Sequence, residues 1–217
     1  MAAITKDIER QVEIPSGERR LSGILHVPPE ARGVVAFAHG SGSGRFSPRN
    51  QFVARLLQEA GLATLLLDLL EESESEDRRK VFDIRLLAER LQSAADWLKQ
   101  ESATRALRLG YFGASTGAGA ALVAAARDPE AVGAVVSRGG RPDLAGDSLS
   151  AVQAPTLLIV GGNDRAVIEL NEQALRLLLS PKQLVIIPGA THLFEEPGTL
   201  EEVARLAKDW FVGKLAL

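Results

Sequence analysis

Three residues of the types that form a nucleophilic catalytic triad occur in this sequence, each just after a strand-like segment. Ser115 lies in the pentapeptide G-A-S-T-G, Asp164 follows residues 156–160, and His192 follows residues 182–187. A serine hydroxyl becomes a useful nucleophile when a base takes its proton, and a carboxylate holds that base in the right tautomer. The order Ser, Asp, His therefore predicts acyl-transfer chemistry, with Ser115 as nucleophile, His192 as base and Asp164 as orienting acid.

Each of the three residues has an ordinary explanation when it is taken singly. Asp164 would serve equally well as the cap of a following helix, and a lone loop histidine such as His192 is usually not catalytic. Their common position favours the triad, because the carboxyl ends of parallel strands meet at one edge of a sheet. We therefore expect the three side chains to lie close together.

The pentapeptide around Ser115 stands between a strand-like segment, 108–112, and an alanine-rich, helix-like segment, 118–127. A G-x-S-x-G sequence between strand and helix forms a tight turn that exposes the serine hydroxyl. The flanking glycines are needed because a side chain there would strike the neighbouring strand or helix. The positive end of the helix dipole then favours an anion near Ser115. A chance match is the alternative, since small residues are common in this chain.

A glycine-rich loop with the sequence H-G-S-G-S-G, residues 39–44, follows the apolar segment 33–38. Its glycines allow backbone N–H groups to turn toward an anion. We expect the oxyanion of the reaction to be bound by the N–H groups of Thr116 and Ser41. A phosphate-binding loop fits less well, because neither the G-x-x-x-x-G-K-[ST] nor the G-x-G-x-x-G pattern is present. We expect His39 to brace this loop and not to act as the base.

The composition restricts the other kinds of function. A chain of 217 residues suits one domain, 1–217, and its net charge of −3 gives no reason to expect nucleic acid or an anionic membrane as partner. The absence of cysteine excludes disulfides, thiolate catalysis and cysteine-based zinc sites, and we expect neither metal nor cofactor. The third histidine, His26, lies far from any motif, so we expect it to be structural.

The sequence gives no sign of a targeting or membrane segment. The first residues lack the apolar core of a signal peptide. No apolar run approaches the ~20 residues of a membrane helix. We therefore expect a cytoplasmic enzyme.

Strand-like and helix-like segments alternate along most of the chain. The expected strands are residues 9–14, 19–27, 33–38, 63–67, 108–112, 131–136, 156–160 and 182–187. The expected helices are residues 48–60, 84–99, 118–127, 167–179 and a last helix from 199. The first two strands read as an antiparallel hairpin, and the alternation that follows predicts a doubly wound, mostly parallel sheet.

Local signals refine two of these helices and one connection between strands. Ser47 and Pro48 are typical of a helix N-cap with proline in the first turn. Thr199 and Glu202 predict a capping box for the last helix. The segment between the strands 131–136 and 156–160 is too short for a helical cap domain.

The segment 71–80 carries an unusual concentration of charge. It contains five acidic residues within 71–77, followed directly by Arg78, Arg79 and Lys80. A partner-binding surface is one interpretation. We favour the other, a solvated connection between a strand and a helix.

The motifs together resemble the α/β-hydrolase superfamily over nearly the whole chain, and the compact layout is similar to its dienelactone hydrolase-related branch. The resemblance is carried by residues 39–43, 113–117, 137–144 and 189–194, which are similar to a group of bacterial hydrolases in that branch. It implies an α/β-hydrolase fold with an eight-stranded sheet, antiparallel N-terminal strands and no cap domain. Some relatives are fused to a phosphoribosyltransferase domain, which we do not expect in this chain. Dienelactone hydrolase itself has a cysteine nucleophile, so Ser115 favours ordinary esters.

These observations predict a serine carboxylesterase that cleaves small acyl esters through an acyl-enzyme on Ser115. A thioesterase, peptidase or acyltransferase would use the same triad. A catalytically idle hydrolase fold that acts as a binding module is an alternative of another class, and a nucleotide-binding regulator rests only on the glycine loop.

Arg138 is a candidate substrate-binding residue. It follows the strand 131–136, so we expect it at the same sheet edge as Ser115. Its planar guanidinium suits a carboxylate or phosphate on the substrate. The alternative is a structural role, in which Arg138 ties down carbonyl or acidic groups of its own loop, 137–143.

Overall fold

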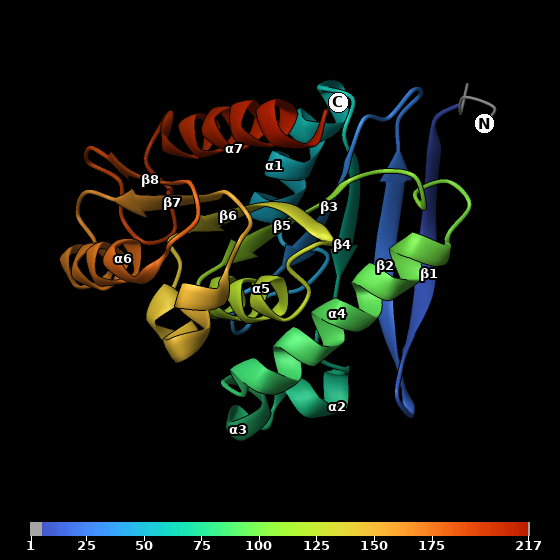
Figure 1. Ribbon diagram of the computed structural model, residues 1–217, viewed down its shortest axis with the longest axis horizontal. Helices are drawn as coiled ribbons and strands as arrows, with labels where there is room; N and C mark the ends of the chain where they lie inside the picture. The colour runs from blue at the N-terminus through green and yellow to red at the C-terminus, as the bar shows by residue number, and fades with distance from the viewer. Residues whose placement is uncertain (1–5, 217) are drawn as a thin grey trace.

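The computed structural model describes residues 6–216 as one eight-stranded sheet with helices on both faces (Figure 1). The strand order is β1-β2-β4-β3-β5-β6-β7-β8. β2 pairs antiparallel with β1 and β4, and the remaining neighbours are parallel. The strands are β1 (Ile8–Ser16), β2 (Arg19–Val27), β3 (Val34–Ala38), β4 (Ala63–Leu67), β5 (Leu109–Ala114), β6 (Val132–Arg138), β7 (Thr156–Gly161) and β8 (Lys182–Ile187). The predicted sheet and its antiparallel N-terminal hairpin are confirmed.

The helices divide between the two faces of the sheet. α1 and α7 pack on one face, whereas α4, α5 and α6 cover the other (Figure 1). They are α1 (Pro48–Glu59), α2 (Glu72–Ser75), α3 (Arg78–Val81), α4 (Ile84–Gln100), α5 (Thr116–Arg127), α6 (Arg165–Leu177) and α7 (Thr199–Leu215), with a 3₁₀ segment η1 (Pro142–Ala151). Every residue of β3, β4, β5 and β7 is buried, which explains their continuous apolar sequences. Within residues 6–216, no helix has the length and apolarity to cross a membrane.

The parallel strands β3 to β8 end at one edge of the sheet, and the segment that follows each of them lies there. The residues predicted to form a site lie at this edge: Ser41, Ser115, Asp164 and His192 follow β3, β5, β7 and β8, Arg138 ends β6, and Thr116 begins α5. The connection between β6 and β7 is the single segment η1, and no helical cap domain is inserted there. Within residues 6–216, this edge of the sheet is therefore formed by its own connecting segments, with no inserted domain between β6 and β7.

The helix-start signals give one confirmed prediction and one correction. The Ser47 hydroxyl accepts a hydrogen bond from the Asn50 N–H at 3.4 Å, and Pro48 is the first residue of α1, as predicted. The capping box at Thr199 is wrong, because α7 begins at Thr199 and its cap residue is Gly198. The Thr199 hydroxyl instead donates to the Glu196 carbonyl oxygen at 2.7 Å, so it closes the preceding turn.

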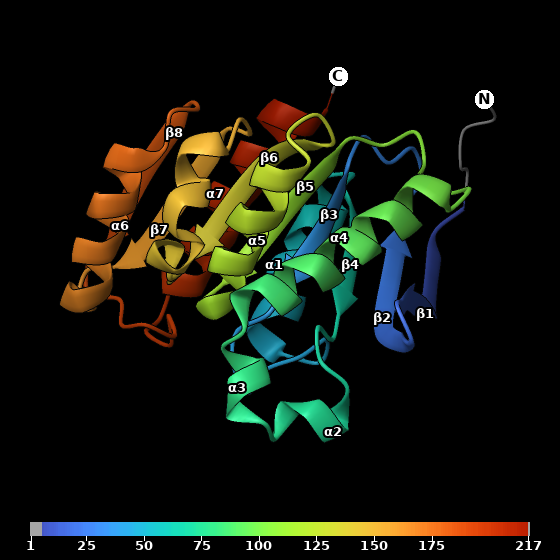
Figure 2. The same ribbon diagram turned by 60° about the horizontal axis from the view of Figure 1, so that its bottom comes forward.

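The charged segment 71–80 is more ordered than a solvated connection. It forms the short helices α2 and α3, which project beside the start of α4 (Figure 2). Glu74 is buried and pairs with Arg90 of α4, so the solvated interpretation is wrong for this residue. Asp77 and Arg79 form a separate pair in which the Arg79 side chain is exposed. The acidic pattern thus contains one buried ion pair among exposed charges.

Candidate active site

Ser115 occupies a strained turn between β5 and α5. It is the cap residue of α5, with φ 50° and ψ −122°, a backbone conformation that few non-glycine residues adopt. A Cβ on Gly117 would collide with the carbonyl oxygens of Ala38 and His39, and a Cβ on Gly113 would collide with α5. The turn therefore requires both glycines of the G-x-S-x-G sequence, and its tightness presents the partly exposed Ser115 at the start of a helix.

The loops after β7 and β8 bring Asp164 and His192 together. His192 Nδ1 lies 2.7 Å from Asp164 Oδ2, and the imidazole is about half-exposed while the carboxylate is mostly buried. This contact leaves Nε2 as the ring nitrogen available to a second partner. A catalytic triad uses the same pairing, in which the acid binds Nδ1 and leaves Nε2 for the nucleophile. Among residues 6–216, no hydrogen bond joins His192 to the Ser115 hydroxyl.

Asn163 joins the two loops that carry the acid and the histidine. Its backbone N–H donates to the Ala190 carbonyl oxygen at 2.9 Å, and its side-chain amide donates to the Gly189 carbonyl oxygen at 2.9 Å. These bonds set the distance between Asp164 and His192. Sequence reasoning missed Asn163, although its place directly before the acid was a usable signal.

The loop 39–44 approaches the turn at Ser115 closely; we call it the oxyanion loop. A Cβ on Gly40 would lie 3.0 Å from Ser115 Cβ, so the loop backbone packs directly against the predicted nucleophile. The Ser41 N–H donates to the Thr116 hydroxyl at 3.2 Å. Both predicted oxyanion donors therefore belong to segments in mutual contact, with the Ser41 N–H directed at the start of α5.

His39 is the first residue of this loop, and its ring is hydrogen-bonded to the loop backbone and to Leu69. Its Nε2 accepts a hydrogen bond from the Leu69 N–H at 2.9 Å, so Nδ1 carries the proton and donates to the Gly40 carbonyl oxygen, also at 2.9 Å. Burial lowers the pKa of His39 and keeps the ring neutral. Both ring nitrogens are occupied, which matches the role of a brace.

The loop after β6 is tied to the same turn. The Arg141 N–H donates to the Ser115 carbonyl oxygen at 3.0 Å, and the Ser115 N–H donates to the Arg138 carbonyl oxygen at 3.3 Å. The Asn171 side chain, from α6, donates to the Gly140 carbonyl oxygen at 3.0 Å. Backbone groups and Asn171 hold this loop, and sequence reasoning did not single out Asn171.

The Arg138 side chain is buried without a carboxylate partner among residues 6–216. It pairs in register with the residue before Ser115, Ala114, and it is 7% exposed. Nη2 donates to Asn50 Oδ1 at 3.3 Å, Nε has no partner among the described residues, and the guanidinium lies 5.9 Å from the Phe194 ring centre. Burial, together with repulsion from Arg49, lowers the pKa of Arg138 to about 10. The side chain is still charged at neutral pH.

A cavity of about 900 Å³ opens beside the oxyanion loop. Its lining includes the oxyanion loop, the start of α1, residues 20–22 of β2 and part of the charged segment 71–80. Thr116 is the lining residue next to Ser115 in the chain, whereas Ser115, Asp164, His192 and Arg138 do not line the cavity. The volume is within the range of small-molecule sites.

The sequence and the fold of this chain are similar to those of known hydrolases. Residues 22–211 match the model of the dienelactone hydrolase family. The crystal structure of dienelactone hydrolase from Anabaena variabilis is 59% identical, with a TM-score of 0.94, and the match covers 96% of this chain and 99% of that one. The esterase domain of a Rhodothermus marinus protein has the same fold at 19% identity, with a TM-score of 0.77 and coverage of 95% and 99%.

A curated relative carries a different kind of name. A Mycobacterium tuberculosis protein, provisionally named a phosphoribosyl transferase, is 58% identical over 207 residues. The match covers 95% of this chain but 47% of the relative, so the chain spans about half the length of that protein. The model match and the solved relatives show an α/β-hydrolase fold, and this chain belongs to the dienelactone hydrolase family.

Proposed function

We propose that this chain is a serine hydrolase that cleaves small acyl esters through an acyl-enzyme on Ser115. The observation that carries the proposal is the 2.7 Å contact between His192 Nδ1 and Asp164 Oδ2, at the sheet edge where Ser115 caps α5. The contact orients Nε2 for proton transfer. The strained turn at Ser115 supports the same role, because such strain is concentrated at functional sites.

In the proposed reaction, Ser115 Oγ attacks the ester carbonyl carbon while His192 Nε2 takes the hydroxyl proton. The Thr116 and Ser41 N–H groups bind the resulting oxyanion, and the Ser41 N–H then exchanges its bond to the Thr116 hydroxyl for the oxyanion. The tetrahedral intermediate collapses, the ester bond breaks, and the departing alcohol takes the proton from His192. Water then attacks the acyl-enzyme, His192 takes a proton from it and returns one to Ser115, and the carboxylic acid leaves.

The proposed site includes Arg138 as a residue that binds an anionic group of the substrate. Among residues 6–216, the buried Arg138 guanidinium has a single hydrogen bond, which is costly unless an anion completes its pairing. The loop 137–143 is held by other groups, so this side chain is not needed to tie it down. Small esters that carry a carboxylate or phosphate are therefore the proposed substrate class.

The experiment that tests the hydrolase is labelling with a fluorophosphonate probe, followed by a panel of esters graded by acyl length. Ser115 should be the labelled residue, and the panel should define the preferred acyl group. A thioester, an amide and an acceptor alcohol in the same panel distinguish thioesterase, peptidase and acyltransferase chemistry. Absence of labelling and of turnover would instead support the idle binding module.

The name of the mycobacterial relative does not change this proposal. The family model matched by residues 22–211 is a hydrolase family, and the match to the relative covers 47% of its length. We assign hydrolase chemistry to the matched region. A nucleotide-binding role is tested by a thermal-shift screen with nucleotides, for which we expect no stabilisation.

A further inference from the structure

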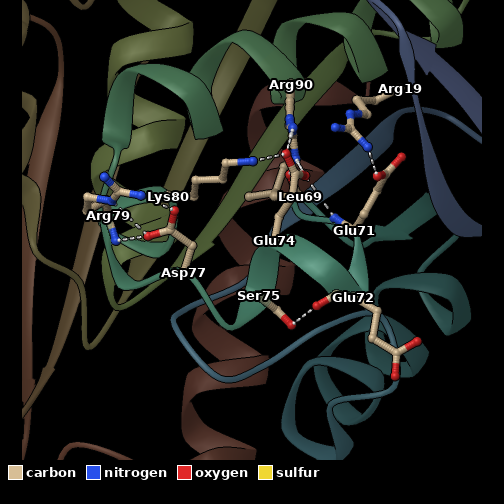
Figure 3. Close-up of polar contacts among 10 residues, drawn as sticks. All are labelled: Arg19, Leu69, Glu71, Glu72, Glu74, Ser75, Asp77, Arg79, Lys80 and Arg90. Atoms are coloured by element: carbon tan, nitrogen blue, oxygen red, sulfur yellow. Dashed lines mark hydrogen bonds and ion pairs between the residues drawn. The ribbon is translucent and has the colours of Figure 1, made fainter.

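The charged segment 71–80 carries one residue, Glu74, that is anchored to α4 by a buried ion pair (Figure 3). Glu74 and Arg90 are 4% and 5% exposed. Arg90 Nη1 donates to Glu74 Oε2 at 2.6 Å and Arg90 Nη2 to Glu74 Oε1 at 2.9 Å. The pair is therefore a two-pronged one, the geometry in which arginine binds a carboxylate most specifically.

The same guanidinium also reaches the chain just beyond β4. Arg90 Nη1 donates to the Leu69 carbonyl oxygen at 2.7 Å. The Leu69 N–H donates to His39 Nε2, and His39 Nδ1 donates to the Gly40 carbonyl oxygen. A continuous series of hydrogen bonds thus leads from Glu74 through Arg90, Leu69 and His39 to the oxyanion loop.

Burying the Glu74–Arg90 pair costs free energy because both charges lose their hydration, so stability alone does not explain why the pair is present. Replacing a buried ion pair by packed apolar residues is often neutral or stabilising. The polar pair does something that an apolar pair would not, because only a donor can bind the Leu69 carbonyl oxygen. We propose that Arg90, held by Glu74, is a positioning residue for the oxyanion loop, an inference that rests on the proposed hydrolase function.

A positioning role predicts a specific kinetic effect. The oxyanion exists in the transition state and not in the bound substrate, so a displaced oxyanion loop lowers kcat more than it raises KM. Arg90→Met should reduce kcat on a neutral ester roughly tenfold and change KM by less than about twofold. The rates are normalised to folded protein, so a loss of stability alone does not mimic the effect.

The chain supplies a matched control in the same segment. Arg79 is 91% exposed and pairs with Asp77, and neither residue contacts Leu69 or His39. Arg79→Met should leave kcat within about twofold of the wild type. Arg90→Lys keeps the positive charge but not the planar, two-pronged guanidinium, so its kcat should lie between those of the wild type and Arg90→Met. If Arg90→Met does not fold, Glu74→Gln serves as the second variant. It weakens the hold on Arg90 but keeps the guanidinium, so it should lower kcat by less than about tenfold and leave KM unchanged. A wild-type kcat in folded Glu74→Gln protein would then overturn the proposal.

A double-mutant cycle tests the route through His39. His39→Leu removes both ring nitrogens and with them the link from Leu69 to Gly40, so Arg90→Met should cost little more in that background than His39→Leu alone. Additive losses, or wild-type kcat in folded Arg90→Met protein, would overturn the positioning role. Failure of the proposed function is a separate result, because the wild type would then lack ester turnover that Ser115→Ala abolishes.

Discussion

The two sides of the turn at Ser115 are built by different means. On the side of β7 and β8, Asp164 and His192 are placed by loops that Asn163 joins through hydrogen bonds to backbone carbonyl oxygens. On the side of β3 and β4, the oxyanion loop is held by a buried histidine and a buried ion pair. The loops after β7 and β8 are joined mainly by backbone groups, so substituting most side chains should leave their positions unchanged. The position of the oxyanion loop depends instead on buried ionisable side chains, so it should change with pH and with the loss of any one charge.

The comparison implies that the two sides will respond differently to substitution. Changes to the reacting groups should abolish turnover without affecting the fold. Changes on the oxyanion side should give partial losses that are linked to stability. The predictions below rank these effects from largest to smallest.

Ser115→Ala should have the largest effect on turnover. Loss of a triad nucleophile reduces kcat by ~10⁴–10⁶ in other hydrolases, and removing the hydroxyl does not disturb the packing of β5 or α5. Steady-state kinetics and circular dichroism should show an inactive, folded protein. A variant that retains as much as about a tenth of wild-type turnover would mean that Ser115 is not the nucleophile.

His192→Ala should be nearly as damaging, and the double variant with Ser115→Ala little worse than either single one. Residues that act as one unit do not contribute additively. Steady-state kinetics of the three variants on one ester provide the measurement. A double variant that is much less active than either single variant would show that the two residues do not act as one unit.

Arg138→Met should act on one kind of substrate. Its loss should raise KM for an ester that carries a carboxylate by an amount worth ~1–3 kcal/mol, and leave a matched neutral ester nearly unchanged. The pair of esters supplies the control within one experiment. Equal losses on both esters, accompanied by a lower Tm, would assign Arg138 a structural role.

His39→Gln should reduce kcat less than His192→Ala does, by roughly tenfold, because it loosens the oxyanion loop without removing the base. Kinetics of the two variants on the same ester provide the measurement. If His39→Gln is the inactive variant and His192→Ala keeps its activity, then His39 is the catalytic base and His192 has the structural role.

Glu74→Gln should change the stability of the fold at acidic pH more than it changes turnover at neutral pH. The hydrogen bonds from Arg90 lower the pKa of Glu74 from 4.5 to about 2. A carboxylate with a lowered pKa stabilises the fold fully above the unfolded value of 4.5, and this contribution disappears as pH falls toward 2. The Tm difference between wild type and variant should therefore shrink across that interval.

The buried His39 does not obscure this measurement. Its pKa is lowered, so it destabilises the fold as pH falls below 6.5. That loss occurs in both the wild type and Glu74→Gln, so the difference between their Tm values isolates Glu74. A Tm difference that stays constant from pH 6 to 2.5, to within about a degree, would show that the carboxylate is not stabilised by Arg90.

The sequence alone determined the features that depend on local chain chemistry. Apolar runs fixed β3, β5 and β7, because strands buried on both faces admit few polar side chains. The glycines around Ser115 marked the turn, because no side chain fits at Gly117. The order of Ser115, Asp164 and His192 after strands indicated that they lie at one edge of the sheet, since parallel strands end at one edge.

Only the tertiary structure decided which polar groups are paired. Glu74 stands among six other charged or hydroxyl residues between positions 71 and 77, and its sequence neighbours do not distinguish it. Its burial follows from Arg90, sixteen residues away on α4, which the fold brings against α2. Arg138, predicted from its strand end, likewise donates a hydrogen bond to Asn50 that no local pattern specifies. Such pairings depend on the packing of distant elements, because a side chain's partner is set by three-dimensional proximity.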